Sequence, residues 1–160
     1  MTTASSPAAT AFVRAGGEAV LRPAMERFVQ QLAVDPMIGF LFGQADLPRL
    51  ALREYQLAAQ FLGAEVEYEG RPLQRAHAPF PITGGMFARR RFLLEQELRR
   101  SEVADDIVDL WLAHTDSLRA QITPQPGGRC DTRATGGPLL SRWEPPAANP
   151  VPVGNPLEPQ

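Results

Sequence analysis

The segment Leu73-Gln74-Arg75-Ala76-His77-Ala78-Pro79-Phe80-Pro81-Ile82-Thr83 places one of the two histidines of the chain just before two prolines. Each proline fixes its own φ angle and disfavours a helical conformation in the residue before it. His77 is therefore predicted to end a short helix over residues 71–76. One ring nitrogen of a neutral imidazole there could bind a metal while a carbonyl holds the other. Taken alone, the segment favours a histidine that has no special task over a metal ligand.

Upstream of this segment, residues 47–62 have the pattern of an amphipathic helix, with Asp46 as its cap and Gly63 after its last turn. Its predicted inner face is apolar except for one carboxylate, Glu54. An unpaired ionised carboxylate in a core costs several kcal/mol, so Glu54 should be protonated, paired or at the edge of a solvent-accessible pocket. The alternative is a side chain at the margin of the face that extends into solvent. The inner face consists of Leu47, Leu50, Glu54, Leu57 and Phe61.

Downstream, Thr83 is expected to cap a helix over residues 85–100, and Ser101 a last helix over residues 102–121. Three successive arginines, residues 89–91, interrupt the apolar face of the first of these helices. At least one of them should come close to the core, and the others should lie on a solvated face with buried stems. His114 falls on the apolar face of the last helix, where a hydrogen-bonded core histidine is favoured over a metal ligand.

Nearer the N-terminus, Gly16-Gly17 precedes a helical pattern that ends near Asp35-Pro36. Pro23 lies inside this pattern, and we expect the regular helix to begin just before it rather than to contain a kink. Residues 37–42 are predicted to form a buried corner with Phe42 pointing inward. The buried face of the helix is formed by Leu21, Met25, Phe28 and Leu32.

The length of 160 residues predicts one domain. We place a globular domain at residues 12–122, a mobile N-terminus at residues 1–11, and a tail at residues 123–160. The tail holds nine of the sixteen prolines and five of the thirteen glycines. It shows no helical or strand periodicity, so it should be largely disordered. Its only sizeable apolar anchors are Leu139, Leu140 and Trp143.

The charge and cysteine content exclude several classes of protein. A formal net charge of −2 argues against a nucleic-acid partner, although all sixteen basic residues are arginines. No apolar run is long enough to span a membrane, and no signal peptide is visible. The single Cys130 rules out an internal disulfide and fits a reducing compartment, so a cytoplasmic location is expected.

The histidine and cysteine count also limits the metal chemistry. Two histidines and one cysteine cannot complete a tetrahedral zinc cage without carboxylates, and neither a phosphate-binding loop nor a nucleophile motif is present. A cofactor that brings four ligands of its own needs only one from the protein. Haem has this property, and one axial histidine in an apolar helical pocket satisfies it.

Over about residues 12–122 the chain resembles the truncated haemoglobins. The resemblance implies an all-α fold, a short globin-like two-over-two helical sandwich, with haem b as cofactor and His77 as the proximal iron ligand. Features of the first and second groups of the family are mixed. The matching segments are Gly16-Gly17-Glu18-Ala19, Arg27-Phe28, Asp35-Pro36, Phe40-Leu41-Phe42, Leu62-Gly63, Tyr68-Glu69-Gly70-Arg71-Pro72-Leu73 and residues 77–83.

The resemblance extends to further cofactor-binding residues. It implies that Phe42, Leu50 and Tyr68 lie against the haem. Arg53 and Arg75 are expected to pair with the haem propionates, because they occupy more solvent-exposed positions and carboxylates favour guanidinium groups.

The departures from the family concern the ligand side of the haem. Val29 stands where the family usually has a tyrosine that holds dioxygen, so oxygen should be released faster. Glu54 stands where a glutamine or another polar donor often serves, and Arg90 where an apolar residue or tryptophan covers the pocket. An ionised Glu54 can only accept hydrogen bonds, whereas a protonated one could donate. Arg90 could pair with Glu54, donate to the ligand or reach a propionate.

The sequence thus predicts a haem-binding globin that binds a diatomic ligand, dioxygen or nitric oxide, with a reductase as a candidate partner. Whether it is an enzyme stays open. Nitric oxide dioxygenase and peroxidase-like activity are both compatible, with Glu54 as acid or base and Arg90 stabilising charge. The alternative is a globin-fold interaction module whose haem binding is weakened or lost.

Overall fold

The computed structural model describes residues 9–123, and all regular structure in this range is helical. The predicted all-α class is confirmed, while most of the predicted N-terminal segment and nearly all of the tail lie outside the described residues. None of the described helices is both long and apolar enough to cross a bilayer. The elements are α1 (Ala11–Arg14), α2 (Gly17–Val34), the 3-10 helix η1 (Gly39–Phe42), α3 (Leu47–Phe61), α4 (Leu73–His77), α5 (Gly84–Arg100), α6 (Asp105–Ser117) and α7 (Arg119–Ile122).

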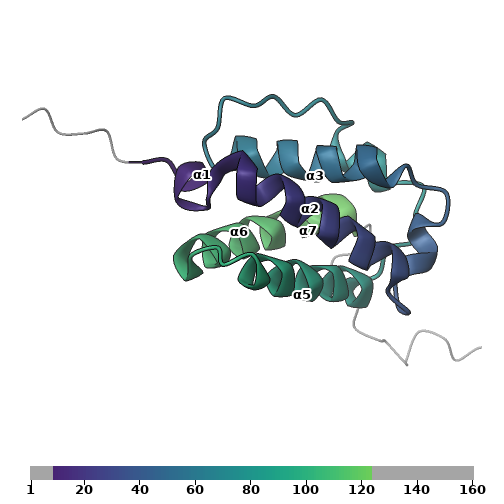
Figure 1. Ribbon diagram of the computed structural model, residues 1–160. Helices are drawn as coiled ribbons and strands as arrows, with labels where there is room; N and C mark the ends of the chain where they lie inside the picture. The colour runs from purple at the N-terminus through teal and green to yellow at the C-terminus, as the bar shows by residue number, and fades with distance from the viewer. Residues whose placement is uncertain (1–8, 124–160) are drawn as a thin grey trace, which may run out of the picture. The chain divides into compact units, whose positions relative to one another are not determined.

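Four long helices form two packed pairs. Helix α2 packs against α3 and also against α5, which in turn packs against α6 (Figure 1). This is the predicted two-over-two arrangement, with α2 at its centre. The core-facing residues expected on α2 are all buried, and the helix contributes several of the largest fully buried side chains: Leu21, Met25, Phe28 and Leu32.

The predicted inner face of α3 is only partly in the core: Leu47, Leu50 and Phe61 are partly buried against it, while the fully buried residues lie on a neighbouring face. The residues that join the core beside α2 are mostly alanines, and small side chains of this kind allow two helices to approach closely. Leu50, Glu54 and Leu57 instead line a cavity on another face of α3. The carboxylate of Glu54 therefore does not interrupt the core. The core-facing residues of α3 are Ala51, Tyr55, Ala58 and Ala59.

Pro23 lies well inside α2, so the expectation that the regular helix begins just before it is wrong. Its missing N–H leaves the carbonyl of Ala19 without the usual helical partner. Both residues are exposed, so water can satisfy this carbonyl. The N-cap residue Gly16 has a φ of 96°, a left-handed conformation that favours glycine.

The junction between α5 and α6 also differs from the prediction. Ser101 follows α5, and its hydroxyl donates to the carboxylate of Glu97 and accepts from Arg27. Because its hydroxyl is engaged there, it does not cap the next helix, which begins only at Asp105. The intervening turn contains Glu102, whose φ of 57° is uncommon for a residue other than glycine.

Two ion pairs with buried carboxylates join α5 to the end of α2. Glu97 is fully buried, and its two oxygens accept from Arg27 at 2.7 Å and Gln31 at 2.8 Å. Asp35 accepts two hydrogen bonds from Arg89 at 3.0 and 2.8 Å. Removing Arg27 would leave the buried carboxylate of Glu97 without its charged partner, which is destabilising. These contacts fix the position of α5, which carries part of the site described next.

Candidate functional site

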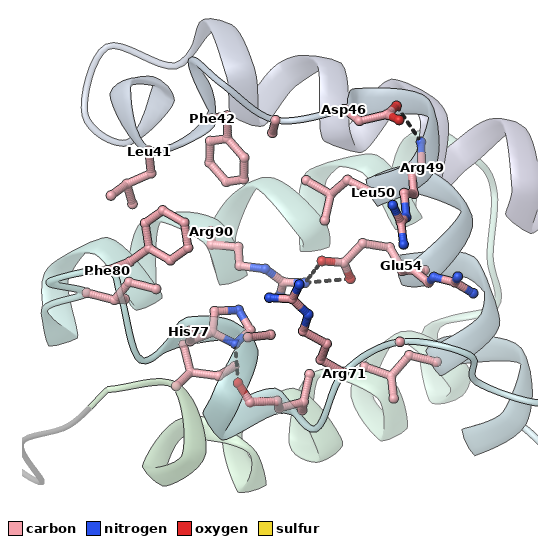
Figure 2. Close-up of a pocket in the computed structure, with 18 of the residues that line it drawn as sticks. Leu41, Phe42, Asp46, Arg49, Leu50, Glu54, Arg71, His77, Phe80 and Arg90 are labelled. Carbon is pink, nitrogen blue, oxygen red and sulfur yellow. Dashed lines mark hydrogen bonds and ion pairs between the residues drawn. The ribbon is translucent and has the colours of Figure 1, made fainter.

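A cavity of about 450 Å³ lies between η1, α3, the loop that follows α3, α4 and α5 (Figure 2). This volume is within the range of about 300–1,000 Å³ that is typical of small-molecule and cofactor sites. Most of the wall is apolar. Its hydrophobic side chains include Leu41, Phe42, Leu50, Phe80, Ile82 and Met86.

His77 is the last residue of α4 and lines this cavity. Its Nδ1 lies 2.7 Å from the carbonyl oxygen of Leu73. Because a carbonyl can only accept, this hydrogen bond places the proton on Nδ1 and leaves the lone pair on Nε2. A metal-ligating histidine needs this tautomer and this second hydrogen bond. Helix α4 begins two residues later than predicted and includes His77, and it ends before the two prolines, as predicted.

Glu54 and Arg90 form an ion pair on the cavity wall. Nη2 of Arg90 lies 2.7 Å from both carboxylate oxygens, and the two side chains are only 20% and 21% exposed. The guanidinium also lies 5.2 Å from the centre of the Phe28 ring, a cation–π distance. Nε and Nη1 of Arg90 make no hydrogen bond to any described residue. One of the three arginines thus reaches the interior, as predicted, and its partner is Glu54.

The loop that follows α3 closes one side of the cavity. Arg53 donates to Glu69 at 2.6 Å, and Gln56 bonds the same carboxylate at 3.1 Å. These two hydrogen bonds hold the pKa of Glu69 below its usual value, and the bond from Arg53 has the larger effect. Tyr68 donates from its hydroxyl to the carbonyl of Arg71 at 3.1 Å. Burial and the nearby charge of Glu54 raise the pKa of Tyr68, so its hydroxyl stays protonated at neutral pH.

The structure brings most of the predicted site residues together in this cavity. Arg75 is exposed and is not among the residues that line it. Val29 is buried in the core and likewise does not line the cavity. The predicted residues on the wall are Phe42, Leu50, Arg53, Glu54, Tyr68, His77 and Arg90.

Two lining residues, Arg49 and Arg71, were not assigned to the site from the sequence. Both are exposed at the cavity and form no ion pair with any described residue. Arg49 follows the capping residue of α3, and the pattern placed it on the solvated face. Arg71 belongs to an irregular loop, which has no periodic pattern from which the direction of its side chains could be predicted. The many arginines in this part of the sequence were the feature that could have indicated these two residues.

A second, smaller cavity of about 50 Å³ is also lined by His77, on the side of α6 and α7. Helix α7 packs against α4, and Leu118 and Ile122 share this space with His77. His114 also lines it, but its ring stacks on Phe61, with ring centres 3.7 Å apart. Burial lowers the pKa of His114, which favours its neutral form. The ring is thus held by stacking rather than by the expected hydrogen bond.

A family model described as bacterial-like globin matches residues 10–123. The chain is a member of this family, the truncated haemoglobins. Membership implies haem as the cofactor of this globin and a small molecule as its ligand. The predicted family is therefore confirmed.

One curated relative of the globin is a group 1 truncated hemoglobin of Chlamydomonas moewusii, 26% identical over 81 residues. The match covers 47% of each chain, so it spans about half the length of this relative.

Solved structures share the fold of the globin. The group II truncated hemoglobin of Bacillus anthracis superposes with a TM-score of 0.69 at 22% identity, over 78% of this chain and 98% of that one. The Fe(III) form of the Tetrahymena pyriformis truncated hemoglobin gives a TM-score of 0.66 at 19% identity, over 72% and 98% of the two chains. The hemoglobin of Chloroflexus aurantiacus gives 0.65 at 23% identity, over 73% and 99%.

The donor set of the globin fits haem. Within residues 9–123 no three histidine, cysteine or acidic side chains come together as a cage for a bare ion. A single imidazole, His77, instead presents its free Nε2 to a largely apolar cavity. The exposed cations Arg49 and Arg71 at the same cavity suit the carboxylates of the cofactor.

Proposed function

We propose that this globin holds haem b through His77 and binds a diatomic ligand, dioxygen or nitric oxide, in the cavity beside Glu54 and Arg90. One observation carries the proposal. The Nδ1 of His77 is held by the Leu73 carbonyl, so Nε2 is available to a ligand inside an apolar cavity of about 450 Å³. When bound, haem supplies the iron at which the diatomic ligand coordinates.

The wall residues position the cofactor and exclude water. Phe42 and Leu50 supply apolar contact area to the ring system, and Tyr68 closes the loop side. The sequence predicts Arg53 and Arg75 as partners of the propionates. The geometry favours Arg49 and Arg71, because Arg53 is engaged with Glu69 and Arg75 lies outside the cavity lining. Guanidinium groups suit these carboxylates because they can donate two parallel hydrogen bonds.

The polar pair is the chain's means of acting on the bound ligand. Arg90 can donate to a partly negative ligand atom through the nitrogens that Glu54 does not occupy. Glu54, when ionised, accepts hydrogen bonds but cannot donate one to bound oxygen. In an enzymatic role, as nitric oxide dioxygenase or in peroxide reduction, Glu54 would hold or release a proton and Arg90 would stabilise negative charge. A reductase would then be the partner.

A haem titration of purified variants tests the proposal. We expect His77→Ala to lose stoichiometric haem uptake, because no other described histidine has a free nitrogen at the large cavity. His114→Ala, the matched control, should keep it, because that ring stacks on Phe61. The measurement is the Soret band during addition of haem. An unchanged ferrous spectrum in the His77 variant would refute the ligand assignment.

The Glu54 and Arg90 pair favours one other function. A charged pair inside the cavity resists displacement by an apolar ring, because separating the partners leaves unpaired charges. A globin-fold interaction module without haem would be compatible with that. The same titration separates the two functions, since the interaction module would show no Soret band in the unmodified protein.

A further inference from the structure

The pairing of Glu54 and Arg90 leaves most of the guanidinium available. A single nitrogen, Nη2, bonds both carboxylate oxygens, while Nε and Nη1 have no partner among the described residues. Every deeply buried side-chain nitrogen or oxygen in the described range has a partner, so these two nitrogens face accessible space. Arg90 also lies over the Phe28 ring, which supports it from the side of the core. The cavity therefore contains a supported cation with spare donors beside a carboxylate.

The charge balance of the cavity determines which ligands suit this pair. An anion that enters an apolar cavity loses its hydration and adds an uncompensated charge, which is costly. A neutral weak acid HX has no such cost on entry. If it gives its proton to the carboxylate, the anion X⁻ that remains can pair with the guanidinium. The sum of charges in the cavity is then the same before and after binding.

We infer that the cavity takes up weak acids HX by splitting them between Glu54 and Arg90, and this rests on the proposed function. The bond between H and X breaks, its electron pair stays on X, and the proton moves to a carboxylate oxygen of Glu54. Arg90 would then donate hydrogen bonds to X⁻, and the group held by His77 would supply the metal that binds this anion. Neutral Glu54 is a weaker acceptor than the carboxylate, so it releases Nη2 for the anion. The ligand class comprises hydrogen sulfide, hydrogen cyanide, hydrazoic acid and hydrogen peroxide.

The other charged groups of the large cavity are either paired with one another or exposed. Arg53 and Glu69 pair with each other, and Asp46 caps α3 by accepting from the backbone of Arg49. The side chains of Arg49 and Arg71 are exposed.

The remaining titratable groups near the pair do not compete for the proton. Tyr68 donates to a carbonyl, and Nδ1 of His77 is committed to Leu73. His114 shares the small cavity with Glu54 and Arg90, but burial lowers its pKa, which makes it a poor proton acceptor. Glu54 is therefore the carboxylate that receives the proton.

Azide binding to the ferric haem-loaded protein tests the inference by counting protons. Azide is almost fully ionised near neutral pH, so binding it as hydrazoic acid takes up one proton from the buffer. Calorimetry in buffers of different ionisation enthalpy measures this number. We expect about one proton per azide for the unmodified protein and about none for Glu54→Gln. Arg90→Leu should weaken azide binding by about ten- to hundredfold, because it removes a charge-assisted hydrogen bond.

Glu95→Gln is the matched control, because Glu95 is also paired with an arginine, Arg99, but does not line the cavity. It should bind azide with the same affinity and proton count as the unmodified protein. A proton count near zero in the unmodified protein, or a count unchanged in Glu54→Gln, overturns the inference. So does a ferric protein that holds haem but binds no azide. Absence of a Soret band would instead overturn the proposed function, so the two failures are distinguishable.

Discussion

Three arginines connect helices that are far apart in the sequence. Arg27 pairs with Glu97 over 70 residues, Arg89 with Asp35 over 54, and Arg90 with a glutamate over 36. Each pair includes a residue of α5 and joins this helix to α2 or α3. At the scale of single residues, arginine thus both holds the fold together and, through Arg90, supplies the polar group of the cavity.

The pair of Asp35 and Arg89 predicts a specific dependence of stability on pH. Hydrogen bonding to Arg89, followed by bonds from the backbone of Met37 and Ile38, lowers the pKa of Asp35 below its ordinary value of 3.8. A depressed pKa stabilises the fold above the ordinary value, and this contribution is lost as pH falls through the pKa in the folded state. We expect Asp35→Asn to be less stable than the unmodified protein at pH 7. The difference should shrink as the pH falls below about 4.

Chemical denaturation at a series of pH values measures this difference. Asp109→Asn is the control, because Asp109 is exposed and pairs with no described residue. It should follow the unmodified protein at every pH. A constant gap between Asp35→Asn and the unmodified protein from pH 7 down to pH 3 would contradict the assignment.

Single residues were predictable where they broke a local pattern. Glu54 stood out because a carboxylate interrupted an apolar face, and His77 because two prolines followed it. Both line the cavity. Arg71 broke no pattern, because its place on the wall depends on how the loop folds back. The burial of Glu97 was equally hidden, since its partner Arg27 lies 70 residues away.

At the scale of elements, caps and breakers located the helices well. Asp46 and Thr83 cap α3 and α5 as predicted, because a cap is a local contact within one turn. The buried face of α3 was predicted only in part, since apolar size alone does not distinguish a helix face in the core from a face on a cavity. Alanines provide the close contact with α2, and larger leucines line the cavity.

The packing of α7 against α4 predicts that a residue far from His77 in the sequence controls how firmly the cofactor is held. Ile122→Ala would remove apolar contacts beside His77 and loosen α4. We expect a loss of about 2 kcal/mol or more in stability, together with faster haem loss. Transfer of haem to an excess of a haem-free acceptor protein measures the rate of loss.

Ile107→Ala provides the comparison, because Ile107 is buried in α6 and lines neither cavity. It should lose a similar amount of stability by the same cavity effect but release haem at the original rate. Equal acceleration of haem loss in both variants would show a general loosening of the fold rather than control through α4.

At the scale of the whole chain, the hydrophobic core cluster of the described residues lies between Ala15 and Leu112. From composition, residues 126–160 offer little apolar area to bury. We therefore expect their deletion to leave helix content unchanged and the melting temperature within about 3 °C, a shift worth roughly 1 kcal/mol for domains of this size.

Circular dichroism during heating measures both quantities. Tryptophan fluorescence gives an independent control, because Trp143 is removed and Trp111 is retained in the buried part of α6. A drop of 10 °C or more in the melting temperature would show that the deleted segment stabilises the fold, with Trp143 as the residue that anchors it.

The contact between α4 and α7 has a consequence for the order of events during synthesis. His77 leaves the ribosome well before Ile122, yet the helix that carries it packs against α7, the last helix of the described chain. Domains fold as units as the chain emerges, N-terminal parts first. A nascent chain that ends before residue 119 therefore has its histidine but not the support of that histidine's helix. We therefore expect capture of the cofactor that we propose to be a late step, which follows the emergence of α7 from the ribosome.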